Sequence, residues 1–123
     1  MSNLFAVVAR HRCRDGRYTS IYLVSNALED VDSDVLELVA AYMDIDGFAP
    51  SYDDAFEDMA FNVYKGCVLE HVERISLPKE LVERILEAVD NARRGVFDRK
   101  KLVSLGRELE SYIRSRTRRA EAA

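Results

Sequence analysis

The histidines and cysteines are the residues of this chain best suited to metal chemistry. The 123-residue sequence contains two of each, arranged as His11-x-Cys13 and Cys67-x-x-x-His71. Residues two apart share a face of a strand, and residues four apart share a face of a strand or a helix, so each pair could direct both side chains at one point. Together they would supply the four ligands of a tetrahedral zinc site. Neither pair has the usual zinc-ligand spacing, and simple burial of the cysteines is the stronger interpretation.

Cys67 and His71 are also the one nucleophile and base pair that could serve a thiol enzyme. The neighbouring Glu70 and Glu73 do nothing to favour a thiolate there. The sequence has no Gly-rich phosphate loop, no Gly-x-Ser-x-Gly and no His-Glu-x-x-His. We therefore expect a non-enzymatic protein without a cofactor, with zinc or thiol chemistry at these residues as the lesser alternative.

Charge is distributed unevenly along the chain. The segment Ala27–Tyr64 holds eleven carboxylates and no Lys or Arg, whereas arginines gather just before it and at the C-terminus. Basic clusters of this kind can contact phosphates, with an affinity that falls as salt rises. The arginines that nucleic-acid binding would use are Arg10, Arg12, Arg14, Arg17, Arg114, Arg116, Arg118 and Arg119.

The same arginines could instead pair with the acidic segment, within one chain or between two copies. The net charge of −4 repels nucleic acid at long range, which favours the protein–protein interpretation. Exposed ion pairs contribute little free energy, so this complementarity would set orientation more than strength. We expect a homo-oligomer, with nucleic-acid binding as the alternative; the partner, the number of copies and the pathway are left open.

Length and composition are typical of one globular domain, residues 1–123, with 117–123 as a frayed tail. The chain is 48% hydrophobic and 33% charged, which is far from the disordered class, and no apolar run is long enough to cross a membrane. The N-terminus lacks the pattern of a secretory signal, so we expect a cytoplasmic protein.

Two cysteines are too few for a secreted disulfide scaffold. A reducing compartment would keep Cys13 and Cys67 as thiols unless the host is a hyperthermophile. The absence of Gln and the excess of Arg over Lys fit a thermophile or a GC-rich genome.

Leu4–Val24 reads as a β-hairpin, because two apolar, β-branched runs flank Asp15-Gly16, a strong type I′ turn signal. We expect Arg14 to face Arg17, with the base of the hairpin buried on both sides and the tip in water. The register that follows pairs Cys13 with Tyr18, His11 with Ser20, Ala9 with Tyr22 and Val7 with Val24.

Apolar residues at steps of three and four predict two helices in the acidic segment. The first begins at the cap Asn26, or alternatively near Ser33, and ends before Gly47. The second is capped by Ser51 and ends at Gly66. Its predicted buried residues are Phe56, Met59, Ala60 and Val63, and those of the first helix are Leu28, Val31, Val35, Leu38, Tyr42 and Ile45.

The segment Cys67–Leu77 fits either a strand or a helix, and the flanking Gly66 and Pro78 favour a strand. Two amphipathic helices follow, separated at Gly95, and they form an αα-hairpin whose apolar stripes a partner could cover. The stripes are Leu81, Val82, Ile85, Leu86 and Val89, then Leu102, Leu105, Leu109, Tyr112 and Ile113.

Residues 70–113 resemble one known family. The run Arg74-Ile75-Ser76-Leu77-Pro78-Lys79-Glu80-Leu81-Val82-Glu83-Arg84-Ile85, with Gly95 and Arg99 before Leu102-Val103, is similar to the strand and two helices of ribbon-helix-helix DNA-binding domains. The resemblance implies that outward residues of the strand, Arg74 and Ser76, would enter the major groove of DNA.

The sequence as a whole predicts an α+β fold. An N-terminal hairpin, joined by a third antiparallel strand if Cys67–Ile75 is extended, packs against about four helices that end in the αα-hairpin. The expected function is self-association through complementary acidic and basic surfaces and the apolar face of the αα-hairpin.

Overall fold

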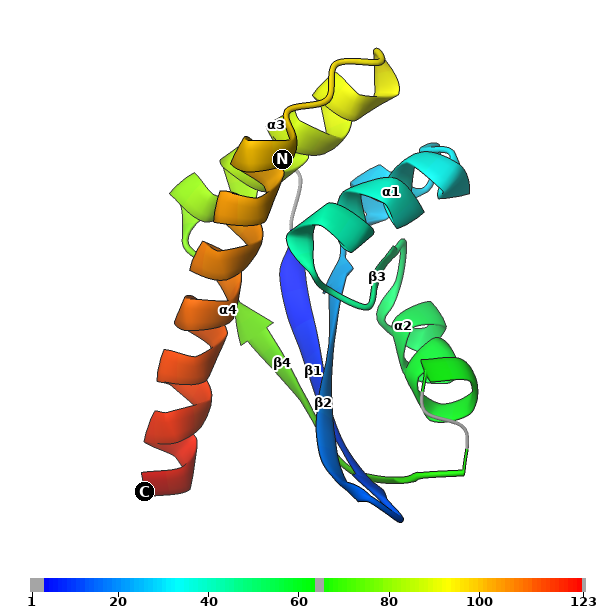
Figure 1. Cartoon of the computed structure of the whole chain (residues 1–123), viewed down its shortest axis with the longest axis vertical. Helices are drawn as coiled ribbons and strands as arrows, with labels where there is room; N and C mark the ends of the chain where they lie inside the picture. Colours follow the sequence, from blue (N-terminus) through cyan, green and yellow to red (C-terminus); the bar gives the residue numbers. More distant parts are fainter. Residues whose placement is uncertain (1–3, 64–65, 123) are drawn as a thin grey trace.

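The computed structural model describes the backbone of residues 4–63 and 66–122 and the side chains of 4–61 and 66–117. It confirms the α+β class: a four-stranded mixed sheet carries helices on both faces (Figure 1). The strands are β1 (Phe5–Cys13), β2 (Gly16–Val24), β3 (Gly47–Ala49) and β4 (Val68–Ser76). The helices are α1 (Ser33–Met43), α2 (Tyr52–Asp58), α3 (Lys79–Arg93) and α4 (Arg99–Ala122), with a 3-10 turn at Asn26–Leu28 and a π-helical turn at Met59–Val63.

The strand order is β3-β2-β1-β4, so the hairpin β1–β2 forms the centre of the sheet. β4 pairs antiparallel with β1, which confirms a strand after Gly66. β3 pairs parallel with β2 and was not predicted. It has only three residues, too few for a two-residue alternation to show in the sequence.

The predicted hairpin register is wrong by two residues. Cys13 lies opposite Gly16 and His11 opposite Tyr18, so Arg14 and Asp15 form the turn. A type I′ turn would need positive φ at Asp15, but only Gly16, at 142°, adopts it there. Because a shift of two preserves which side chains share a face, the predicted faces and the buried base with an exposed tip are confirmed.

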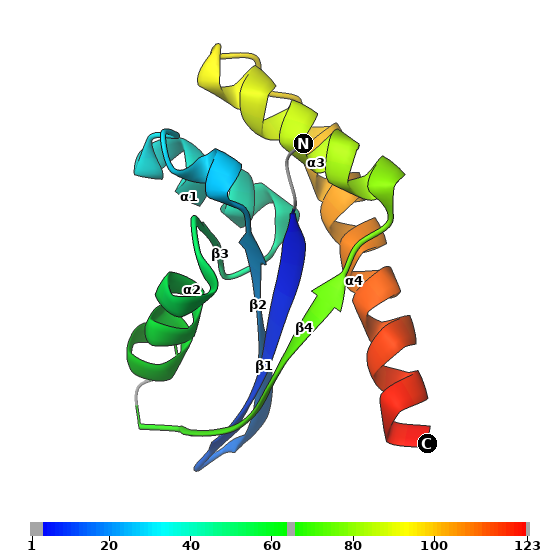
Figure 2. The same ribbon diagram turned by 180° about the vertical axis from the view of Figure 1, so that it is seen from behind.

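The two faces of the sheet carry separate cores. On the α2 face, Val7, Ala9 and Tyr22 pack against Ala55 and Met59. On the opposite face, which we call the α4 face, a larger core joins β1 and β2 to α1, α3 and α4 (Figures 1 and 2). The residues that α1, α3 and α4 contribute to this core include Val39, Met43, Leu81, Ile85, Val89, Leu102, Leu105, Leu109 and Ile113.

Local capping explains where the helices of the acidic segment begin. Asp32 accepts the Asp34 N–H, so α1 has the later of the two predicted starts, while Ser25 caps the 3-10 turn at Asn26. Ser51 caps α2 as predicted. Leu38 and Phe56, both expected to be buried, are 46% and 39% exposed. The face that each of α1 and α2 buries against the core is narrower than the predicted apolar stripe.

The C-terminal helices follow the prediction closely. Pro78 precedes α3. Gly95, in the connection that follows α3, has a φ of 82°, and Asp98 accepts the Lys101 N–H at the start of α4. The predicted stripes of α3 and α4 are largely buried within the chain, so the apolar area that this hairpin leaves to a partner is small. Helical backbone continues to Ala122; fraying of the tail stays a prediction.

α4 crosses α1 at unusually close range. A Cβ atom built on Gly106 would lie 2.0 Å from the carbonyl oxygen of Met43, at the C-terminal end of α1. Only a residue without a side chain permits this backbone approach.

No helix in the described part of the chain is both long and apolar enough to span a membrane.

Candidate functional site

The four candidate zinc ligands do not converge. Cys13 and Cys67 form a disulfide with a Cα–Cα distance of 4.3 Å, so neither sulfur is a thiolate available to a metal or a substrate. His11 is buried on the α2 face, whereas His71 lies opposite Arg10 on the α4 face. Across the described residues, no three His, Cys, Asp or Glu side chains are placed to hold a metal ion. The disulfide removes two of the four ligands from the zinc site that the sequence offered as the lesser alternative, and the cysteines are not the free thiols expected in a reducing compartment.

A β-bulge separates these side chains. The pairing of β4 with β1 shifts by one residue between Arg10 and His11, which leaves Glu70 as the extra residue. Beyond the shift, Arg12 faces Val68, and Cys13 comes to lie beside Cys67. Residues four apart would share a face of a regular strand, but the bulge puts Cys67, just before β4, and His71 on different faces.

His11 is a structural residue in this arrangement. Its side chain is 2% exposed, and its Nε2 lies 2.8 Å from the Ser20 hydroxyl, so the ring is hydrogen-bonded on the buried face. Burial lowers the pKa of His11, with a smaller opposing effect from the charge of Asp46. We infer that the ring stays neutral at physiological pH.

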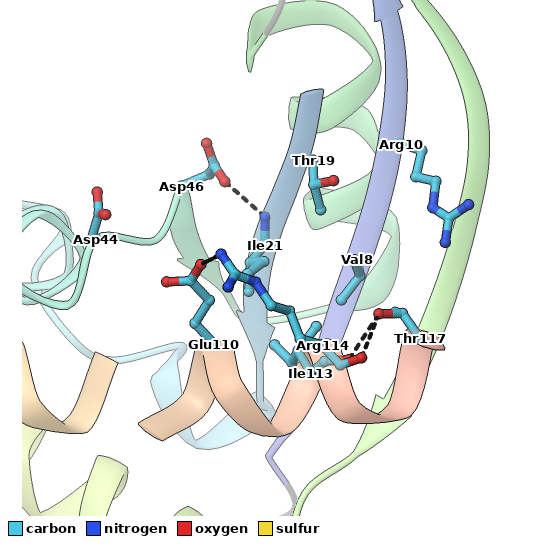
Figure 3. A pocket seen from close by; sticks show the side chains of 10 residues that line it. All are labelled: Val8, Arg10, Thr19, Ile21, Asp44, Asp46, Glu110, Ile113, Arg114 and Thr117. Atoms are coloured by element: carbon cyan, nitrogen blue, oxygen red, sulfur yellow. Dashed lines mark hydrogen bonds and ion pairs between the residues drawn. The ribbon is translucent and has the colours of Figure 1, made fainter. Parts of the chain in front are cut away.

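A groove lies between the α4 face of the hairpin and the C-terminal half of α4 (Figure 3). It has a volume of about 460 Å³. Its polar lining is Arg10, Thr19, Asp44, Asp46, Glu110, Arg114 and Thr117.

Internal bonds hold several of these groups. Asp46 accepts the Ile21 N–H at 2.7 Å, and Arg114 donates to Glu110 at 2.6 Å. Burial raises the pKa of the Asp46 carboxyl, and the negative charge of Asp44 adds to that rise, while the Ile21 N–H opposes it. The carboxylates of Asp44, Asp46 and Glu110 lie toward one side of the groove and Arg10 lies at the other (Figure 3).

The groove brings the two predicted basic clusters together. Arg10 comes from the hairpin and Arg114 from α4, and they line the same groove. Arg12, Arg14 and Arg17 are exposed at the hairpin tip. Arg116 lies 5.8 Å from the Tyr112 ring centre, and the predictions for Arg118 and Arg119 fall outside the described side chains.

The ion pairs seen for five arginines do not involve the acidic segment. Arg12 and Arg17 approach Glu70 at 3.8 and 3.6 Å. The pairs on the C-terminal helices are Arg84–Glu108, Arg94–Asp90 and Arg114–Glu110. Each carboxylate lies after Tyr64, so these contacts leave the charge of Ala27–Tyr64 to be balanced by other groups.

On the α2 face, the acidic segment exposes a surface that carries both carboxylates and aromatic rings. We call it the α2 surface: Asp53, Asp54, Phe56, Glu57 and Phe61, all exposed, with Phe61 at 68%. Beside it, the Arg74 guanidinium lies 4.0 Å from the centre of the Tyr52 ring. Arginine is therefore already a partner for an α2 aromatic within the chain.

Comparison of the chain with protein-family models, with curated proteins and with solved structures finds no match. The strand, helix, helix order implied by the ribbon-helix-helix resemblance is present as β4, α3 and α4. Of the two implicated residues, Arg74 stacks on Tyr52, and the Ser76 carbonyl accepts a hydrogen bond from Tyr112.

Proposed function

We propose that this chain is a small non-enzymatic interaction protein that self-associates. Arginines at the hairpin tip and along the groove of one copy would dock on the α2 surface of another. The observation that carries the proposal is that the two surfaces belong to opposite faces of one sheet. Arg12 and Arg17 share the α4 face with Arg10, whereas α2 packs on the other face. Within one chain the sheet keeps the arginines away from the α2 surface. The arginines of a second copy are not restricted in this way.

The chemistry of the two surfaces is complementary. Arginine forms ion pairs with carboxylates and also stacks on aromatic rings, and the α2 surface offers both. Exposed ion pairs contribute roughly 0.2–1 kcal/mol each, so we expect a moderate affinity that weakens as salt screens the charges. Phe56 and Phe61 would supply the apolar part of the contact.

Charge reversal at either surface should weaken self-association. In Arg14→Glu/Arg17→Glu and in Asp53→Lys/Glu57→Lys, two attractions become repulsions, at a cost of about 2 kcal/mol or roughly thirtyfold in affinity. Light scattering after size-exclusion chromatography at low and high salt measures the loss. Mixing the two variants should restore a complex, because their reversed charges match again.

Glu87→Lys provides the control, since it reverses an exposed charge on α3 away from both surfaces. It should associate like the wild type. A wild-type chain that is monomeric at every salt concentration would contradict the proposal, and so would a mixture of the two reversed variants that fails to form a complex.

Nucleic-acid binding is the second candidate, favoured by one feature of the fold. The hairpin tip projects at one end of the molecule (Figure 1), and the Arg12 and Arg17 side chains there are 60% and 78% exposed. A projecting basic ribbon can reach phosphates or a groove.

A salt titration tests this candidate. If it is correct, duplex DNA or RNA should bind with a clear log–log dependence on salt, and Arg12→Ala/Arg14→Ala/Arg17→Ala should lower that slope by up to about three. Fluorescence anisotropy measures both. Arg93→Ala on α3 is the control, and an unchanged slope in the triple variant would remove the tip from consideration.

We propose that the protein is located in the cytoplasm of a thermophilic organism. A stable disulfide is unusual in a reducing cytoplasm, but intracellular proteins of hyperthermophiles are an exception. The absence of Gln supports the same assignment.

A further inference from the structure

The groove between the hairpin and α4 carries opposite charges on its two sides (Figure 3). Asp44, Asp46 and Glu110 form the acidic side, and Arg10 forms the basic side. Arg114 donates to Glu110, so these two groups neutralise each other. Among the residues that line the groove, Asp44 and Asp46 therefore leave the acidic side with excess negative charge.

An apolar floor connects the two sides. Val8 and Ile113 are buried members of the α4-face core, and Ile21 packs against the same core. A ligand in the groove would therefore have charged groups near its ends and hydrocarbon beneath its middle. Thr19 lies opposite Arg10 in the hairpin and adds a hydroxyl donor on the basic side.

The hairpin sets the separation of the two sides. Arg10 lies opposite Thr19, whereas Asp46 accepts the N–H of Ile21, two residues further along β2. Two residues of a strand rise about 7 Å. A chain of about five methylene groups between an ammonium and a carboxylate spans roughly the same distance.

We propose that the groove binds a straight-chain ω-amino acid, with its ammonium group beside Asp44 and Asp46 and its carboxylate beside Arg10 and Thr19. The methylene chain lies over the apolar floor. The groove volume of about 460 Å³ has room for a molecule of this size. Burial raises the pKa of Asp46, and a neighbouring ammonium would offset this effect because it favours the ionised carboxylate.

Isothermal titration calorimetry of the full chain with 6-aminohexanoate tests the proposal. Hexylamine, hexanoate and glycine serve as comparators, because they lack the carboxylate, the ammonium and the methylene chain respectively. We expect 6-aminohexanoate to bind at least about fivefold more tightly than each comparator. No binding of 6-aminohexanoate at millimolar concentration, or equally tight binding of any comparator, would overturn the proposal.

Two variants assign the ends of the ligand. Asp46→Asn should weaken binding of 6-aminohexanoate and hexylamine at least about fivefold but not that of hexanoate, because the amide can still accept the Ile21 N–H without the charge. Arg10→Gln should weaken 6-aminohexanoate and hexanoate but not hexylamine. The controls Glu87→Gln and Arg93→Gln remove exposed charges on α3 and should bind like the wild type. A variant that weakens all probes equally would refute this orientation.

The ligand site goes beyond the proposed self-association, although the groove arginines take part in both. Titration of Asp53→Lys/Glu57→Lys with 6-aminohexanoate separates the two proposals, because the reversed α2 surface no longer attracts these arginines. Binding in that variant supports the groove site even if the wild type proves monomeric. Binding confined to the wild type would put the probe between two copies and overturn the groove site.

Discussion

Gly106→Ala is expected to lower the free energy of unfolding by about 2 kcal/mol or more, although alanine is the better helix former. Helix propensity alone would raise stability by about 1 kcal/mol. The added Cβ, however, would lie 2.0 Å from the Met43 carbonyl oxygen and 2.6 Å from its carbon. Backbone cannot swing aside as a flexible side chain can, and overpacking of this kind costs about 1–3 kcal/mol or more.

Urea unfolding followed by circular dichroism measures this effect. Ser104→Ala is the matched control, because Ser104 is an exposed residue of the same helix, and it should be neutral or slightly stabilising. If Gly106→Ala proved as stable as Ser104→Ala, the close crossing of α1 and α4 would be refuted.

Loss of the Cys13–Cys67 disulfide is expected to cost about 4 kcal/mol. The bridge closes a loop across a sequence separation of 54 residues, and in the chain-entropy description a loop of that size restricts the unfolded state by about this amount. The bridge also fixes the start of β4 to the end of β1, beside the buried His11.

Thermal and urea unfolding with and without a reducing agent measure this contribution. The double variant Cys13→Ser/Cys67→Ser should match the reduced wild type and should not respond to the reducing agent. A wild type whose stability is unaffected by complete reduction, verified by thiol titration, would contradict the prediction.

The sequence carried enough information for the major elements but not for their register. Periodic apolar residues located α3, α4 and the hairpin, because each buries a repeating stripe. The hairpin register depends on which two residues form the loop. Asp15-Gly16 can lie either with both residues in the loop or with Asp15 in the loop and Gly16 as the first residue of β2. β3 is too short to show a pattern, and its pairing depends on the end of α1.

The candidate site was less predictable, since it depends on long-range pairing. The rule that residues four apart share a face failed for Cys67 and His71 because a single bulge intervenes at Glu70. That bulge depends on how β4 meets β1 across more than fifty residues of chain, which local spacing does not encode. That Arg10 and Arg114 line one groove likewise follows from the path of α4 over the sheet.

The bridge between Cys13 and Cys67 encloses β2, α1, β3 and α2 in one covalent ring. A protease that cuts the backbone anywhere between Arg14 and Gly66 therefore opens the ring without releasing a fragment. The nicked molecule keeps its full mass until a reductant acts, whereas a cut between α3 and α4 leaves the last helix attached only by packing.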